Sequence, residues 1–183
     1  MRQGIRIVAV IASSLVVSGL LVTSTGPALG ETSSVDGRES LTRALQGAWL
    51  PLESGLIVSG GEGTPLSAKY EIDDGAFQLS IYTSKNGSAS GDAFVEVIVD
   101  YSAGIVLKTI PISDDGDLAA ARAQKETMDR AKRSLAEATA LAVRANAGYR
   151  AVSATPRLDN GRPMAEIALV RGDEWKIVSE YLD

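Results

Sequence analysis

The chain has 183 residues, a formal net charge of −5, no histidine and no cysteine. Histidine and cysteine supply most general bases, thiolate nucleophiles, zinc ligands and haem ligands, so Ser-His-Asp or Cys-His catalysis and ordinary zinc or haem sites are excluded. The acidic balance argues against a nucleic-acid or anionic-membrane partner, because both require a basic face. We therefore expect no catalytic residue, no metal site and no cofactor, and we expect that the protein is not an enzyme.

Residues 1–30 have the pattern of a secretory signal peptide. Arg2 and Arg6 precede an aliphatic run over residues 7–22, and small residues follow at Ala28 and Gly30. The run is shorter than the ~20 apolar residues that a spanning helix needs, so cleavage after Gly30 is favoured over an uncleaved anchor. Cleavage leaves 16 basic and 23 acidic side chains, a net charge of −7. We expect a soluble periplasmic or secreted protein without stable membrane insertion.

The first part of the mature chain predicts a helical segment followed by a run of strands. Residues 31–37 are small and polar and are expected to be a disordered lead-in. A helix is predicted from about Arg38, and after Pro51 a second amphipathic stretch ends at a cluster of glycines. From Leu66 the apolar period changes to two, which predicts four consecutive antiparallel strands over residues 66–72, 77–82, 94–100 and 105–112.

An alanine-rich segment then separates these strands from a second set. Residues 118–147 contain no proline or glycine and are predicted to be helical, with Asp117 as the N-terminal cap. Ser134 and Glu137 have capping-box spacing, so two alternatives stay open, a kink near Ser134 or one continuous helix. Three further strands are predicted over residues 152–158, 164–170 and 175–182, joined by glycine-containing turns.

The order of helix, strand, polar turn, strand and aromatic-led strand thus occurs twice, which favours an internal duplication. Residues 41–112 and 135–183 resemble the PepSY family, a small extracytoplasmic module in which a helix precedes antiparallel strands. The family-like turn is Asp100 to Gly104, directly after Val99. The resemblance implies a non-catalytic domain with a peptidase-inhibitory or environment-sensing role, and it transfers no catalytic residue.

The expected fold class is α+β. Two PepSY-like units, residues 38–113 and 134–183, would each form an antiparallel sheet with a helix packed on one face. A long helix over residues 114–133 would join them.

Several short patterns have both a functional and a structural interpretation. The aspartates at 114, 115 and 117 resemble part of a calcium loop, but their register favours a turn and a helix cap. Residues 59–64 resemble a phosphate loop, but they follow a helix and favour its termination. The carboxylates of Asp73, Asp74 and Asp100 lie in predicted turns, where solvent argues against an acid/base pair.

Aromatic side chains are the remaining candidates for a binding surface. Core packing is the default explanation for the four that lie on predicted strands, and any that is exposed becomes a candidate partner anchor: Phe94, Trp175, Tyr82 and Tyr181. We expect a binding or inhibitory module that engages another extracytoplasmic protein, such as a peptidase. The alternatives are a cation or small-ligand sensor, a structural envelope protein, and an enzyme of unfamiliar carboxylate-based type.

Overall fold

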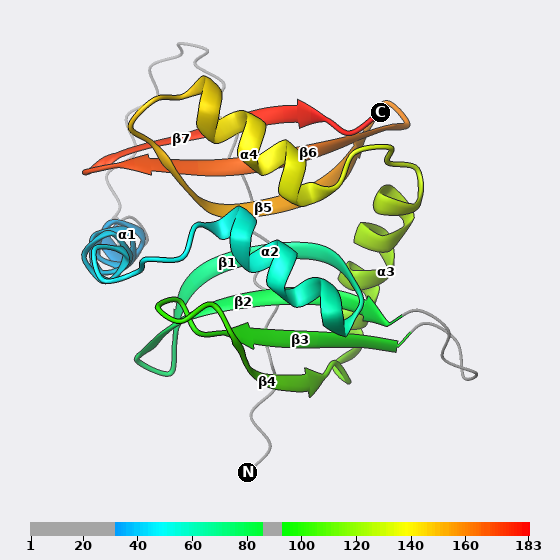
Figure 1. Ribbon diagram of the computed structural model, residues 1–183, viewed down its shortest axis with the longest axis horizontal. Helices are drawn as coiled ribbons and strands as arrows, with labels where there is room; N and C mark the ends of the chain where they lie inside the picture. Colours follow the sequence, from blue (N-terminus) through cyan, green and yellow to red (C-terminus); the bar gives the residue numbers. More distant parts are fainter. Residues whose placement is uncertain (1–31, 86–92) are drawn as a thin grey trace, which may run out of the picture.

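One antiparallel sheet forms the centre of the computed structural model, which describes residues 32–85 and 93–183 (Figure 1). The sheet has seven strands in the order β4-β3-β2-β1-β5-β6-β7. The strands are β1 (Thr64–Asp73), β2 (Ala76–Lys85), β3 (Ala93–Val99), β4 (Val106–Pro111), β5 (Arg150–Asp159), β6 (Arg162–Arg171) and β7 (Glu174–Tyr181). The helices in these ranges are α1 (Thr32–Leu45), α2 (Leu52–Ser59), α3 (Asp115–Asp129) and α4 (Leu135–Ala145), with a short 3-10 turn η1 (Gly60–Glu62). The α+β class and the antiparallel strands are confirmed.

The sheet is continuous, whereas the sequence led us to expect two separate sheets. β1 and β5 pair with each other and so join the two sets of strands edge to edge. The described part of the expected lead-in is also different, because α1 already begins at Thr32.

Two helices lie side by side on one face of the sheet (Figure 1). Leu52 and Leu56 of α2 and Leu135 of α4 are fully buried against the sheet residues Leu79 and Ile167. In both helices the buried residues occupy the first, fourth, fifth and eighth positions. This spacing places them on one stripe of a helix, so each helix presents a single apolar face to the sheet.

α3 packs on the opposite face. Tyr82 and Phe94 join Leu66 and Ala121 in a second buried cluster, while their chain neighbours Ile81 and Val95 belong to the α2 and α4 side. Successive strand residues point to opposite faces, so the two clusters lie on the two sides of the sheet.

The alanine-rich segment is two helices, which settles the alternatives in favour of a break near Ser134. The Ser134 hydroxyl accepts from the Glu137 N–H at 3.2 Å, and the Glu137 carboxylate accepts from the Ser134 N–H at 2.9 Å. The predicted cap of α3 was wrong by three residues. Asp114 is the cap, since its carboxylate accepts from the N–H groups of Gly116 and Asp117, and Asp117 itself is buried in the first turn.

The two halves of the sheet meet at a short seam, which we define as the pairing of β1 with β5. Only Ala68 with Ala154 and Lys69 with Ser153 are paired there. Each strand has a register shift at its third residue, Leu66 in β1 and Val152 in β5, where it pairs with its own hairpin partner. A bulge bends its strand, so β1 and β5 diverge on both sides of the seam.

Candidate functional site

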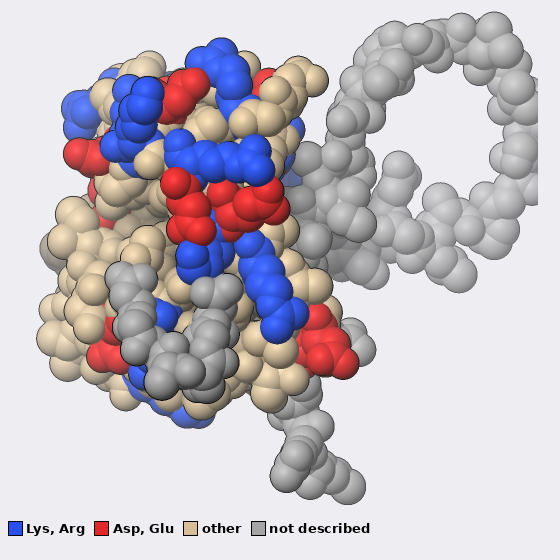
Figure 2. Space-filling model, turned by 90° about the vertical axis from the view of Figure 1, so that its right-hand side faces the viewer, with Lys and Arg blue, Asp and Glu red and all other residues tan. Residues whose placement is uncertain are grey.

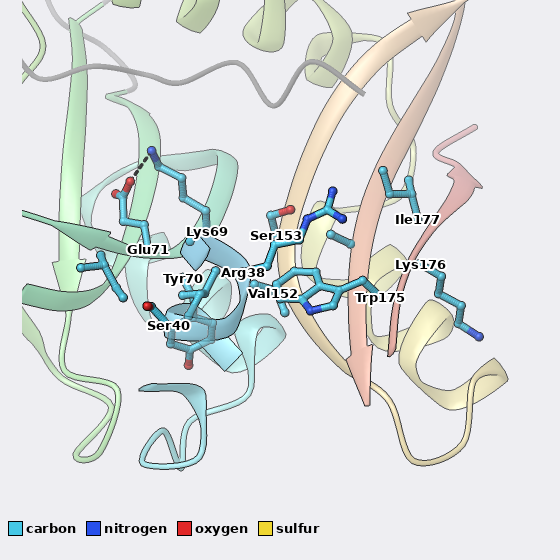
Figure 3. A pocket seen from close by; sticks show the side chains of 14 residues that line it. Arg38, Ser40, Lys69, Tyr70, Glu71, Val152, Ser153, Trp175, Lys176 and Ile177 are labelled. Atoms are coloured by element: carbon cyan, nitrogen blue, oxygen red, sulfur yellow. Dashed lines mark ion pairs between the residues drawn. The ribbon is translucent and has the colours of Figure 1, made fainter. Parts of the chain in front are cut away.

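A groove of about 770 Å³ lies where β1 and β5 diverge (Figure 3). We call it the seam groove. It is lined by one side of α1 between residues 37 and 41, by residues 69–72 of β1, by Val152 and Ser153 of β5, by Ala168 of β6 and by residues 175–177 of β7. It opens on the face of the sheet that carries α3, because Lys69 lies two residues from Ser67, whose hydroxyl donates to Gln124 of α3 at 2.9 Å.

The floor of the groove is a row of side chains across four strands. The pairing places Lys69, Ser153, Ala168 and Ile177 side by side on one face. Trp175 lies on the same face, two residues before Ile177 in β7, and its indole N–H donates to the Thr42 hydroxyl of α1 at 3.3 Å. The indole is therefore fixed against α1 while it still lines the groove.

The charged groups of the groove are unequally neutralised. Lys69 and Glu71 form an ion pair at 2.5 Å, and both side chains are largely shielded from solvent. The Arg38 side chain is exposed and forms no ion pair within the described residues. Lys176 points away from the groove (Figure 3), since its ammonium donates to Asn146 at 2.5 Å and lies over the Tyr149 ring. The groove therefore has one guanidinium available to an anionic group.

The four aromatic candidates occupy different environments. Trp175 is half-buried in the seam groove. Tyr181 is exposed at the β7 edge, where the Arg162 guanidinium stacks on its ring at 4.0 Å and its hydroxyl donates to Asp159. Phe94 and Tyr82 are buried beneath α3 and cannot serve as partner anchors in the folded protein. The candidate set thus reduces to Trp175 and Tyr181.

The family-like turn has a structural task. The Asp100 carboxylate accepts from the N–H groups of Ser102 and Ala103 at 2.7 and 2.8 Å. These bonds, the one from Ala103 foremost, lower the pKa of Asp100. Gly104 has a φ of +67°, which favours glycine. The turn presents the Tyr101 carbonyl to the N–H groups of Trp49 and Leu50, so it holds the connection between α1 and α2.

The acidic sequence candidates lie in a turn or at the start of a helix. Asp73 and Asp74 lie at a two-residue hairpin turn, and the aspartates around Gly116 start α3. No group of three or more acidic side chains is placed to hold a metal ion in the described ranges. Ala28 and Gly30, the predicted cleavage site, lie outside the described residues.

Charged side chains of both signs are interleaved on the side of the molecule that carries α3 (Figure 2). Three ion pairs account for part of this pattern: Lys125 with Asp129, Arg130 with Glu126, and Arg157 with Glu166. Most of these charges are solvent-exposed, and such pairs contribute little stability. This side offers no continuous basic surface among the residues that the structure describes.

Sequence reasoning missed three residues that the structure singles out. Trp49 is 85% exposed on a short connection whose neighbours Ala48 and Leu52 are buried. Arg150 reaches across the chain to the backbone of that same connection. Glu96 is only 4% exposed within an otherwise apolar strand. Of the three, only Glu96 could have been noticed in the sequence, because it is a charged residue inside the apolar run from 94 to 99.

We expect the buried carboxyl of Glu96 to make the stability of the protein depend on pH. Burial raises the pKa of this carboxyl, and the hydroxyl of Tyr82 lies 3.4 Å from it. Because the pKa of Glu96 is higher in the folded protein than in the unfolded chain, its contribution to the free energy of unfolding depends on pH. That contribution is fully present below the ordinary carboxyl pKa and is lost as the pH rises through the folded pKa. Glu96→Gln is therefore expected to stabilise the protein at pH 7.5 by on the order of 1 kcal/mol and to have little effect at pH 4.

Thermal unfolding of both proteins at the two pH values checks this expectation. Glu166→Gln provides the matched control, since Glu166 is a partly exposed glutamate on a strand. A Glu96→Gln protein less stable than the parent at pH 7.5 would show that the carboxylate is needed in its ionised form.

Comparisons with family models, with curated proteins and with solved structures found no match to this chain. Among the described helices, none has the length and apolar character required to cross a membrane.

Proposed function

We propose that the protein is a periplasmic or secreted, non-catalytic module made of two PepSY-like units, and that it binds another extracytoplasmic protein, such as a peptidase, in the seam groove. The secreted location is supported by the signal pattern in residues 1–30. The contact with a peptidase is supported by the family resemblance.

The two-unit organisation is supported by equivalences between the halves. β1 and β5 have the same length and the same bulge position, and each forms a hairpin with the strand that follows. Both hairpins have positive φ at their two turn residues, Asp74 and Gly75 in one and Asn160 and Gly161 in the other. α2 and α4 bury the same four helical positions. A duplicated unit explains these equivalences with one cause.

The seam groove is the single observation that carries the binding proposal. It combines an open shape, a floor that includes the apolar side chains of Ala168 and Ile177, and a fixed tryptophan, and aromatic anchors of this kind dominate protein interfaces. Its one described carboxylate, Glu71, is neutralised by Lys69. General acid/base catalysis requires a group that is available to exchange a proton with a substrate, so this arrangement supports binding rather than reaction.

Substitution of one groove residue tests the proposal. Ile177 lies on the groove floor and is 51% exposed, so Ile177→Asp should leave the fold intact. We expect this change to weaken capture of the partner from the native envelope fraction by about ten-fold or more, because it places a charge in an apolar contact. Quantitative mass spectrometry of the captured proteins provides the measurement, followed by inhibition assays on any captured peptidase.

Ile57→Asp is the matched control, since Ile57 is 70% exposed on α2, on the other face of the sheet. It should capture the same proteins as the parent chain. Equal capture by both variants would remove the groove from the proposal, and turnover of a substrate by the purified chain would contradict the non-catalytic role.

A further inference from the structure

The seam leaves part of β1 without a neighbouring strand on one side. Pairing with β5 ends at Lys69, whereas β1 continues to Asp73 and remains paired with β2 over that length. Alternate residues of a strand direct their N–H and C=O groups to opposite neighbours. Beyond the seam, the groups that face β5 therefore have no strand partner among the described residues. Asp73 and Ala76 flank a two-residue turn and form a hydrogen-bonded pair, so the groups of Asp73 and Glu71 face β2, and those of Ile72 and Tyr70 face β5. We call Tyr70 and Ile72 the open edge.

The open edge borders the seam groove and is closed from the far side. Tyr70 and Ile72 both line the groove. On the α2 and α4 face, the Arg150 guanidinium lies 5.6 Å from the centre of the Tyr70 ring, and the Tyr70 hydroxyl donates to the Leu50 carbonyl. These contacts cover the divergence of the two strands on that face. Access to the open edge is therefore from the α1 side, through the groove.

An unpaired strand edge inside a groove selects a particular kind of occupant. Extended peptides add to exposed sheet edges by main-chain hydrogen bonds, and side-chain pockets on alternate positions give specificity. Here the apolar contacts come from Trp175 and Ile177, and the available charge is Arg38. A carboxylate is the side chain that complements a guanidinium best.

We propose that the partner enters the seam groove as an extended segment that adds to the open edge of β1. Its acidic side chain pairs with Arg38, and an apolar side chain rests on Trp175 and Ile177. This inference rests on the proposed function and specifies the form in which the partner binds.

A pair of peptides tests the main-chain contact. The first is an acetylated and amidated octapeptide of alternating valine and serine with one aspartate near its amino end. The second has the same sequence with N-methyl groups on alternate amides, in two preparations that cover both sets of amides. Binding is followed by the fluorescence of Trp175 in a Trp49→Phe protein, because Trp49 is exposed outside the groove and the chain has only these two tryptophans.

We expect saturable binding of the first peptide and an affinity at least ten-fold lower for one of the two N-methylated preparations. Arg38→Gln should lower the affinity for the unmethylated peptide about two- to five-fold. Arg43→Gln, on the same helix but paired with Glu39, should not change it.

The outcomes separate the two proposals. Equal affinity for all three peptides would overturn strand addition and leave side-chain binding in the groove, which is the proposed function. No response to any peptide up to millimolar concentration would also overturn strand addition, and the capture experiment with Ile177→Asp would then decide the proposed function by itself.

Discussion

Arg150→Met is expected to lower the free energy of unfolding by about 2–4 kcal/mol. The Arg150 guanidinium donates to the carbonyls of Leu45 at 2.7 Å, of Ala48 at 3.0 Å and of Leu50 at 3.5 Å. Both Leu45 and Ala48 are buried. The Leu45 carbonyl would keep the Ala48 N–H, which donates to it at 3.1 Å, but methionine would leave the Ala48 carbonyl without a donor among the described residues. A buried acceptor that loses its partner costs its desolvation free energy, which is why the expected effect exceeds that of one lost bond.

Urea unfolding followed by circular dichroism measures this change. Arg144→Met is the matched control, because Arg144 is exposed near the end of α4, and it should alter the free energy of unfolding by less than about 0.5 kcal/mol. The expectation also includes a local effect. The connection carrying Trp49 should become more accessible to proteolysis in Arg150→Met, since Arg150 fixes its carbonyls. Equal stability of the two variants would show that water replaces the guanidinium.

Gly63→Ala is expected to destabilise the protein by about 3 kcal/mol or more. Gly63 has a φ of +149°, a backbone conformation that residues with a side chain rarely adopt. A Cβ at this position would lie 2.3 Å from the Ser84 carbonyl oxygen and 3.2 Å from the Lys85 Cα. Both are backbone atoms of β2, so relief requires movement of a strand rather than of one side chain.

Gly61→Ala separates this steric effect from the general loss of a glycine. Gly61 lies in the 3-10 turn that ends just before Gly63, and a Cβ there meets nothing within 4 Å. Its replacement should be neutral or slightly stabilising, because alanine restricts the unfolded chain. Urea unfolding of the two variants gives the comparison. A Gly63→Ala protein as stable as Gly61→Ala would mean that the start of β1 moves away from β2 at little cost.

Local patterns in the sequence were sufficient to predict the strands and the hairpins. The period of two from Leu66 and the turn residues at Gly75 and Gly161 predicted the hairpins, and these signals depend only on neighbouring residues. Ser134 and Glu137 have the spacing of a capping box, but the sequence left a kink there and one continuous helix as alternatives, and the structure decides for the break. Asp114 and Asp117 are both good capping residues, and the choice between them depended on the packing of α3 that buries Asp117.

These local patterns could not predict that the two halves join into one sheet. It depends on β1 and β5, which are far apart in the chain, and on bulges at Leu66 and Val152 that leave the alternation of apolar residues nearly unchanged. The seam groove follows from that geometry, so its residues could not be grouped in advance. Trp175 was identified only as an aromatic residue, and nothing in the sequence connects it with Arg38 or Lys69.

Alternation also failed to separate buried aromatics from exposed ones. It assigns Tyr82 and Tyr181 to a strand face, but whether that face is covered depends on where a helix lies. α3 covers Tyr82, while Tyr181 lies on the edge strand beyond it.

The strand order concentrates the entropic cost of forming the sheet in a single step. Every neighbouring pair of strands is consecutive in the chain except β1 and β5, which are separated by β2, β3, β4, α3 and α4. A hairpin closes a short loop and forms quickly. Contacts between distant segments close a long loop, which costs more chain entropy and is slower. Each half can therefore assemble from local contacts, and we expect the slow step to be the docking of the two halves, which joins the two residue pairs of the seam and packs α2 against α4. The seam also has fewer paired residues than any other pair of neighbouring strands in the sheet, so the groove lies where main-chain hydrogen bonding between strands is least extensive.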